Sequence, residues 1–441
     1  MTSRGKWGSR MGFILAASGS AVGLGNIWKF PYITGVYGGG AFVLVYLGFI
    51  LAVGLPIMIS ELIIGHRSQK NPIGAFQKID KKKSIWQSAG WLGVASGFII
   101  LSFYSVVAGQ AMAYIFKSFS GFSGTSEQIV SQFTMLKINP YISVMWHVIF
   151  MILVIAIVIG GIKNGIEKWS KILMPALVVI LLGLTFYGIF YTEGGKQALV
   201  FLFKPDFSKL TSEAVLSALG HSFFTLSLGM GAMITYGSYL GGKINLPKAA
   251  LTVVFMDTII AIFAGIAIFS LVFEFKMEPA SGPGLIFETL PVLFAKTGPL
   301  ISVPFFLLLT FAALTSGISL LEVVVSYFID EKGWSRVKAT LIMGGSILLL
   351  GLLPAIDKIR IQFKGKPQSF FDIFDFISTN YMLPVGGLII ALFVGWKMKE
   401  KLILSNNFNN NHWYYTGWKY ILKYITPIAV MVIILHGLEI I

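Results

Sequence analysis

Long apolar stretches separated by short polar connections follow one another along the whole chain. A helix needs about 20 largely apolar residues to cross the hydrocarbon core of a bilayer, and eleven stretches meet that requirement. They cover residues 10–36, 40–65, 88–116, 141–161, 170–191, 214–240, 249–273, 299–328, 337–355, 370–396 and 417–438. Because no large polar insert separates them, the pattern predicts an all-α polytopic membrane protein, built as one domain over residues 1–441.

The composition agrees with this pattern and excludes several classes of protein. Hydrophobic residues make up 56% of the chain and charged residues only 12%, whereas soluble domains have about 25% charged residues. The absence of cysteine excludes disulfides, thiolate metal sites and cysteine nucleophiles. The five histidines are scattered, and the HExxH, GxSxG and Walker A motifs are absent, so the sequence argues against a membrane-embedded enzyme.

The charge distribution predicts an orientation in the membrane. In a soluble protein a net charge of +15 would suggest nucleic acid, but in a membrane protein Lys and Arg gather in cytoplasmic connections. Placing the amino terminus in the cytoplasm puts most of the 34 Lys and Arg residues on that side. We therefore expect a multi-pass protein of the plasma (inner) membrane with its carboxyl terminus outside. Lipid is its expected surrounding, and we expect no nucleic-acid partner.

Five ionisable residues fall at membrane depth within the predicted spans. They are Lys29, Glu61, Asp257, Glu322 and Asp375. An ionisable group in the hydrocarbon region is costly and normally faces a partner or a water-filled cavity, so these residues are the first functional candidates. A charge near a span end can instead extend toward the membrane surface, and that interpretation stays open for Asp375.

Glycine pairs interrupt two of the predicted spans. Gly23 and Gly25 lie in the first span, and Gly229 and Gly231 lie in the sixth. Each glycine weakens a helix by about 1 kcal/mol relative to alanine, so both spans are predicted to break at mid-depth. Interruptions in matching positions of two halves indicate a transporter with inverted repeats and a midplane site. The alternative is that these small residues only allow close helix packing.

The predicted repeats are residues 1–192 and residues 213–397, which leaves 417–438 as an additional helix. An unwound turn exposes backbone N–H groups that can hold a carboxylate and carbonyl groups that can hold Na⁺. The two breaks therefore predict a site that can hold an anionic carboxylate together with Na⁺.

Several longer motifs carry a family resemblance. They are GSAVGLGNIWKFPY from Gly19, GGGAF from Gly38, Gly54-x-Pro56 followed by Glu61, FFTLSLGMG from Phe223, and FAALTSGIS from Phe311. In this order they resemble the neurotransmitter:sodium symporter family, which has the leucine-transporter fold. Eleven spans and the absence of an N-x-[ST] sequon are similar to the bacterial branch. The resemblance implies a transporter of hydrophobic amino acids.

The resemblance implies two Na⁺ sites and no organic cofactor. The first sodium site corresponds to Ala21, Asn26, Thr225 and Asp257. The second sodium site corresponds to Gly19, Val22, Ala312, Thr315 and Ser316. Without the family, a Thr-Ser pair in a membrane helix is expected to bond back to its own helix.

Chloride-dependent members have a Tyr, a Gln, a Thr and a Ser at positions that correspond here to Tyr46, His221, Thr225 and Ala261. Because Ala261 replaces the serine and Asp257 supplies a negative charge one helical turn earlier, we expect transport that does not depend on chloride. Asp257 is also a candidate to take up a proton on the return step.

The resemblance also assigns a substrate pocket. Its residues correspond to Ala21, Gly23, Gly25, Ile100, Tyr104, Phe224, Thr225, Ser227, Met230, Ser316 and Leu320. Relatives that carry monoamines have Asp at the position of Gly23, so here the substrate must bring its own carboxylate. Met230 can repack around side chains of different size. We therefore expect hydrophobic and aromatic L-amino acids.

Gates on both sides of the pocket follow from the same resemblance. Lys29 and Asp375 correspond to the outer ion pair, although relatives usually have the bidentate Arg in place of this Lys. The inner gate corresponds to Arg4, Asp330, Trp7 and Tyr239. Glu322 is expected to line the inner water path.

The fifth span has Gly165 and Pro175 at a spacing that is associated in the family with unwinding of its cytoplasmic end. An ordinary proline kink is the alternative.

We therefore expect the protein to be a Na⁺-coupled symporter that works by alternating access. A proton-coupled amino-acid carrier on the same fold is the nearest alternative, and a transporter-like sensor or a channel is the alternative from another class. The hydroxyl groups of Thr315 and Ser316 favour Na⁺. The sequence does not predict the oligomeric state.

Overall fold

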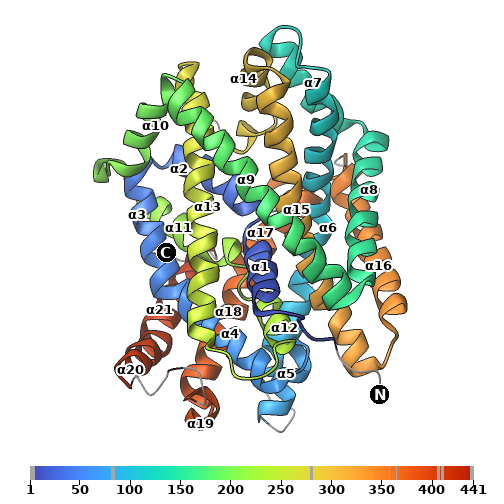
Figure 1. The fold of residues 1–441 in the computed structure, drawn as a ribbon, viewed down its shortest axis with the longest axis vertical. Helices are drawn as coiled ribbons and strands as arrows, with labels where there is room; N and C mark the ends of the chain where they lie inside the picture. The colour runs from blue at the N-terminus through green and yellow to red at the C-terminus, as the bar shows by residue number, and fades with distance from the viewer. Residues whose placement is uncertain are drawn as a thin grey trace.

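A computed structural model describes residues 5–80, 85–278, 282–356, 358–363, 365–404, 408 and 412–437. The fold is a bundle of long helices that run roughly along one axis, with short helices at both ends (Figure 1). Helices α7 and α14 lie at one end of the bundle, and helices α5, α19 and α20 lie at the opposite end (Figure 1).

The helices of the first half are α1 Arg10–Ala21, α2 Phe30–Val36, α3 Gly40–Phe49, α4 Leu55–Ser68, α5 Pro72–Asp80, α6 Gln87–Phe119, α7 Ser126–Ile138, α8 Pro140–Ile159, α9 Lys168–Tyr191 and α10 Gly194–Phe203. Those of the second half are α11 Ser212–Thr225, α12 Ala232–Ser238, α13 Leu246–Glu274, α14 Thr289–Thr297, α15 Pro299–Lys332, α16 Arg336–Ile356, α17 Phe370–Ile377, α18 Leu383–Leu392, α19 Glu400–Leu404, α20 His412–Tyr420 and α21 Thr426–Gly437. Strands β1 Arg360–Phe363 and β2 Lys366–Ser369 form an antiparallel hairpin.

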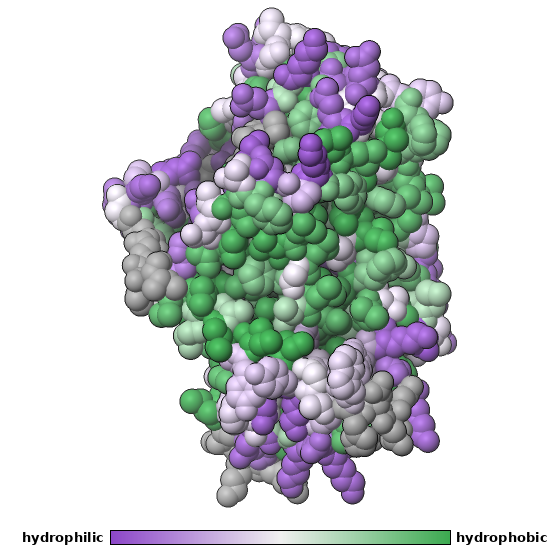
Figure 2. Space-filling view, turned by 90° about the vertical axis from the view of Figure 1, so that its left-hand side faces the viewer, coloured by the Kyte–Doolittle hydropathy of each residue, from purple (hydrophilic) through white to green (hydrophobic). Residues whose placement is uncertain are grey.

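Nine helices of the described chain are long and apolar enough to cross a membrane, and the bent pair Arg10–Ala21 and Gly25–Val36 makes a tenth candidate. The predicted span at residues 214–240 is not one long helix, because it is divided into α11 and α12. Figure 2 shows the consequence on one face of the molecule, where an apolar belt separates two hydrophilic ends.

Burial distinguishes a central group of helices from a peripheral one. In the most apolar part of α15, 94% of the residues are buried, and in that of α6 the share is 78%. In the last span, Trp413–His436, it is only 28%. An apolar helix that is buried on all sides belongs to the interior of a large helical protein. Helices α15 and α6 therefore form the centre against which the interrupted helices pack.

Glycine allows close backbone contact at helix crossings. A Cβ atom on Gly65 of α4 would overlap the carbonyl oxygen of Ile234 in α12. A Cβ atom on Gly109 of α6 would lie 2.7 Å from the carbonyl carbon of Trp146 in α8. Backbone atoms cannot swing aside as a side chain can, so these two glycines set the separation of their helices.

Gly65→Ala should destabilise the protein by about 1–3 kcal/mol, because the added methyl group forces α4 and α12 apart. SDS-induced unfolding in mixed micelles measures this change. Gly48→Ala is the matched control, because nothing lies within 4 Å of its added Cβ and alanine favours the helix. Equal midpoints for the two variants would contradict the close contact.

Candidate functional site

The first interruption lies between α1 and the π-helical turn Gly25–Lys29. Helix α1 ends at Ala21, Val22 has an extended ψ of 103°, and the two helical segments meet at an angle of 48°. The freed backbone groups are bonded to side chains. The Gly23 N–H donates to Asn26 Oδ1 at 3.0 Å, and the Leu24 N–H donates to the Tyr104 hydroxyl at 3.2 Å.

The second interruption, residues 226–231, separates α11 from α12. Ser227, Gly229 and Gly231 have positive φ angles of 54°, 76° and 76°, which glycine tolerates much better than other residues. The Gly229 N–H donates to Glu61 Oε1 at 2.7 Å, so the buried carboxylate of α4 holds the backbone of this interruption. The Ser227 hydroxyl donates to the Ser20 carbonyl at 2.7 Å, so the second interruption directly contacts the last turn of α1.

A small cavity of about 20 Å³ lies where the interruptions meet. Its lining consists of Ser20, Ala21, Gly23, Leu24, Gly25, Ile100, Tyr104, Phe224, Ser227, Met230, Ser316, Ser319 and Leu320. Every residue of the predicted pocket except Thr225 is among them. Three lining residues were not predicted, although each is next to a predicted residue in the sequence. They are Ser20, Leu24 and Ser319.

The shape of the small cavity requires a residue without a side chain at position 23. A Cβ atom at this position would lie 2.5 Å from Ser316 Oγ and 2.9 Å from the Tyr104 hydroxyl oxygen. A side chain here would therefore fill the small cavity and push apart the polar groups around it.

A buried carboxylate lies beside the small cavity. Asp257 of α13 is fully buried, and its Oδ1 accepts hydrogen bonds from Asn26 Nδ2 at 2.7 Å and from the Thr225 hydroxyl at 3.1 Å. The structure thus joins three of the four residues predicted for the first sodium site, and the fourth, Ala21, lines the cavity. Carboxylate, amide, hydroxyl and carbonyl oxygens form a ligand set that suits a hard cation.

The residues predicted for the second sodium site also meet. The Ser316 hydroxyl of α15 lies 3.3 Å from the Gly19 carbonyl oxygen and 3.3 Å from that of Val22. The Thr315 hydroxyl donates to the Ala312 carbonyl at 3.0 Å within α15. Thr315 therefore makes the helix back-bond that the alternative interpretation predicts, and a Cβ atom on Gly19 would lie 3.0 Å from the Thr315 Cβ.

The positions that correspond to the chloride ligands of relatives are all buried. The ring centroids of Tyr46 and His221 are 5.4 Å apart. Within the described chain, the Tyr46 hydroxyl and both His221 nitrogens have no hydrogen-bond partner. Ala261 offers no polar side-chain group beside them.

A large cavity of about 300 Å³ lies on the side of the small cavity that faces α7 and α14. The two cavities share Leu24, Tyr104 and Phe224, so these three residues separate them. Lys29 and Asp375 both line the large cavity. The Lys29 ammonium lies 4.8 Å from the centroid of the Phe224 ring, and no ion pair joins Lys29 to Asp375 within the described chain.

The opposite side of the small cavity is closed by packed aromatic rings. The Trp7 indole donates to the Tyr236 carbonyl at 3.0 Å, and its ring lies edge-on to that of Tyr239 at 6.4 Å. Arg4, the predicted partner of Asp330, lies outside the described residues.

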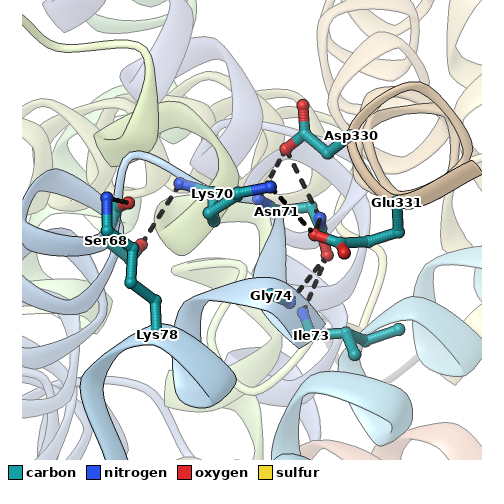
Figure 3. Close-up of polar contacts among 8 residues, drawn as sticks. All are labelled: Ser68, Lys70, Asn71, Ile73, Gly74, Lys78, Asp330 and Glu331. Carbon is teal, nitrogen blue, oxygen red and sulfur yellow. Dashed lines mark hydrogen bonds and ion pairs between the residues drawn. The ribbon is translucent and has the colours of Figure 1, made fainter. Parts of the chain in front are cut away.

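Asp330 holds the connection between α4 and α5 (Figure 3). Its Oδ2 accepts from the Asn71 N–H at 2.8 Å. Glu331 accepts from Asn71 Nδ2 at 2.9 Å and pairs with Lys70 at 3.4 Å. The end of α15 is thereby fastened to the start of α5, where Asn71 Oδ1 also accepts from the N–H groups of the first turn (Figure 3).

Glu322 has partners that the sequence analysis missed. Its carboxylate accepts two hydrogen bonds from the Arg336 guanidinium, at 2.8 and 3.0 Å, and one from the Tyr239 hydroxyl at 2.5 Å. A bidentate arginine pair with a further donor is the arrangement that stabilises a buried carboxylate. Arg336 begins α16, so the turn between α15 and α16 brings the pair together.

The fifth predicted span is continuous in this structure. A π-helical turn, Ile162–Glu167, leads directly into α9, and Pro175 lies inside that helix. Gly165 is tightly packed in the turn, since a Cβ atom there would overlap the Ile157 carbonyl oxygen. Unwinding between Gly165 and Pro175 is therefore not seen here and stays a prediction.

The fold and the site together define a membrane protein in which two interrupted helices meet at a small cavity beside a cluster of buried oxygen ligands, which is the architecture of a secondary transporter. The chain matches the sodium:neurotransmitter symporter family over residues 4–131 and 128–440. It belongs to this family of sodium-coupled transporters and is not an enzyme.

Individual relatives match nearly the whole chain. The uncharacterized sodium-dependent transporter YhdH of Bacillus subtilis is 38% identical, over 98% of this chain and 97% of its own. An uncharacterized sodium-dependent transporter of Haemophilus influenzae is 34% identical, over 99% of this chain and 98% of its own. The crystal structure of MhsT in complex with L-phenylalanine matches with a TM-score of 0.91 and 44% identity, covering 99% of this chain and 100% of that one.

Arg336→Ala should destabilise the protein by about 3–5 kcal/mol, because Glu322 then stays buried without its counter-charge. Arg336→Lys should recover only part of this loss, since lysine cannot form the bidentate pair. SDS-induced unfolding measures both. Lys332→Ala, which removes an exposed cation from the same turn, should stay within about 0.5 kcal/mol; a loss as large as that of Arg336→Ala would refute the buried pair.

Proposed function

We propose that the protein is a Na⁺-coupled symporter that takes up hydrophobic and aromatic L-amino acids by alternating access. The observation that carries this proposal is the meeting of two interrupted helices at the small cavity, directly beside the Asn26, Thr225 and Asp257 cluster. In such a site a substrate carboxylate and Na⁺ neutralise each other between exposed backbone groups.

The lining of the small cavity supports the substrate class. Ile100, Met230 and Leu320 supply apolar surface, and Gly23 leaves no acidic group to bind an amine. A charged substrate side chain would lose its hydration without gaining a partner. The bound L-phenylalanine in the MhsT structure, a close structural match, agrees with an aromatic amino acid.

The proposed topology has eleven spans, in which α11 and α12 together form the sixth. Residues 1–192 and 213–397 would form two inverted repeats of five spans each, and residues 417–438 the additional helix. The amino terminus would lie in the cytoplasm and the carboxyl terminus outside, in the plasma membrane. The distribution of Lys and Arg along the sequence supports this orientation.

Two Na⁺ ions are proposed as co-substrates. The first would bind Ala21, Asn26, Thr225 and Asp257, and the second would bind Gly19, Val22, Ala312, Thr315 and Ser316. The close oxygen atoms at both places support these assignments.

Access from outside would run through the large cavity. Phe224 and Tyr104 would close over the substrate, and the Lys29 ammonium would approach Asp375 above them. Access from inside would require two contacts of the inner gate to open. Trp7 would separate from Tyr239, and Arg4 would separate from Asp330. Unwinding between Gly165 and Pro175 would then let water reach the second sodium site.

Chloride would not be needed, because Asp257 already supplies a full negative charge at the first sodium site. Ala261 offers no ligand for an anion. Uptake of a proton by Asp257 would allow the cluster to return without Na⁺.

A proton-coupled carrier on the same fold is the second candidate. The observation in its favour is that neither nitrogen of buried His221 has a hydrogen-bond partner among the described residues. The oxygen-rich surroundings of Thr315 and Ser316 favour Na⁺ instead. A sensor or a channel would lack accumulation of substrate against its gradient.

Uptake of radiolabelled tryptophan and leucine into proteoliposomes tests the proposed function. An inward Na⁺ gradient should drive accumulation above equilibrium, and replacement of Na⁺ by K⁺ should abolish it. The variant Asp257→Ala should lose this uptake, since the buried cluster then lacks its charge. Accumulation that follows a proton gradient and ignores Na⁺ would support the second candidate.

Replacement of chloride by gluconate should leave the initial rate of Na⁺-driven uptake unchanged, because Asp257 balances the Na⁺ charge. The comparison is made at constant Na⁺ and constant membrane potential. A several-fold drop in the rate would mean that an anion binds near Tyr46 and His221.

A further inference from the structure

Glu167 connects the amino-terminal segment to the π-helical turn before α9. Its side chain is 3% exposed and accepts hydrogen bonds from the Gly8 N–H at 2.5 Å and from the Ser9 hydroxyl at 2.8 Å. The Lys171 ammonium, one turn further along, pairs with the same carboxylate at 2.6 Å. One carboxylate therefore holds two separate parts of the chain.

The amino-terminal segment is shaped to receive this carboxylate. A Cβ atom on Gly12 would overlap the Glu167 side chain, and one on Gly8 would lie 3.1 Å from its Oε2. A Cβ atom on Gly5 would lie 2.8 Å from Ile162 in the same π-helical turn. Three glycines thus let the segment lie directly against the turn.

Electrostatics strengthens this contact. Ser9 is the N-cap of the 12-residue helix α1, and an anion near a helix amino terminus is stabilised by the helix dipole. Hydrogen bonds to a charged acceptor are about twice as strong as those between neutral groups. If α1 separated from the turn, Glu167 would lose its hydrogen bonds from Gly8 and Ser9 and would keep its ion pair with Lys171.

We infer that Glu167 is a positioning residue that couples the position of α1 to the state of the turn Ile162–Glu167. The inference rests on the proposed function, in which the cytoplasmic end must open. If the turn unwinds, Glu167 moves away and α1 loses its anchor. Helix α1 carries the Gly19 carbonyl that meets Ser316, so loss of the anchor also loosens the second sodium site.

The geometry separates this role from that of the aromatic packing around Trp7. Trp7 contacts α12, whereas Glu167 belongs to the segment before α9. Loss of the Glu167 contact should therefore release the amino-terminal end of α1 from the turn before α9 and leave the Trp7 contact with α12 in place.

Thiol labelling provides a direct readout, because the protein has no cysteine. Ser18 of α1 is buried, and its hydroxyl has no hydrogen-bond partner in the described chain. Ser18→Cys is thus a nearly isosteric reporter whose reaction with N-ethylmaleimide requires α1 to separate from its neighbours. The rate is measured in proteoliposomes with Na⁺ on both sides and no amino acid.

In this background Glu167→Gln should raise the labelling rate at least about ten-fold, because charge-assisted hydrogen bonds are lost. Gly12→Ala should raise it similarly by displacing the carboxylate, and the double variant should label no faster than the faster single one. Glu193→Gln, an exposed carboxylate just beyond the other end of α9, is the matched control and should not change the rate.

An unchanged rate in Glu167→Gln, or rates that multiply in the double variant, would overturn the inference. If Glu167→Gln does not fold, two variants of Ser9 replace it. Ser9→Ala removes the hydroxyl that donates to Glu167 and should raise the labelling rate, whereas Ser9→Thr keeps a hydroxyl and should not. Labelling needs no transport. A protein without Na⁺-driven uptake but with these rates would refute the proposed function alone, and normal uptake with unchanged rates would refute the inference alone.

Discussion

Backbone groups inside a membrane must find hydrogen-bond partners within the protein, because hydrocarbon offers none. The two interruptions satisfy this constraint by using side chains of intact helices. Glu61 on α4 accepts from Gly229, and Tyr104 on α6 accepts from Leu24. The surrounding helices therefore determine where the chain can unwind, and the small cavity exists only because those partners are in place.

Buried carboxylates extend the same principle to the whole molecule. Four of them lie outside the interrupted spans: Glu61 on α4, Asp257 on α13, Glu322 on α15, and Glu167 in the turn before α9. Each accepts a hydrogen bond from the first or sixth span or the segment flanking it. In these four contacts the carboxylate is the acceptor, and the first or sixth span or its flanking segment supplies the donor. Any rearrangement of the interrupted spans must exchange these bonds, which limits the conformations they can adopt.

Sequence reasoning succeeded where a feature is local. Apolar stretches predicted the long helices, the glycine pairs predicted both interruptions, and the family resemblance that the motifs carry assigned ten of the thirteen residues that line the small cavity. It failed where two helices must first be packed together. The Arg336 and Glu322 pair depends on the turn between α15 and α16. Glu167 lies between the predicted spans 141–161 and 170–191, and nothing near it in sequence indicates that Gly8 lies against it.

The separation between the two cavities is a single layer made by Leu24, Tyr104 and Phe224. A molecule short enough to fit below that layer can be enclosed. A longer one with the same head group would reach through it into the large cavity and hold the aromatic rings apart. Molecular length alone would then divide compounds into those that are carried and those that stall the protein while it is open to one side.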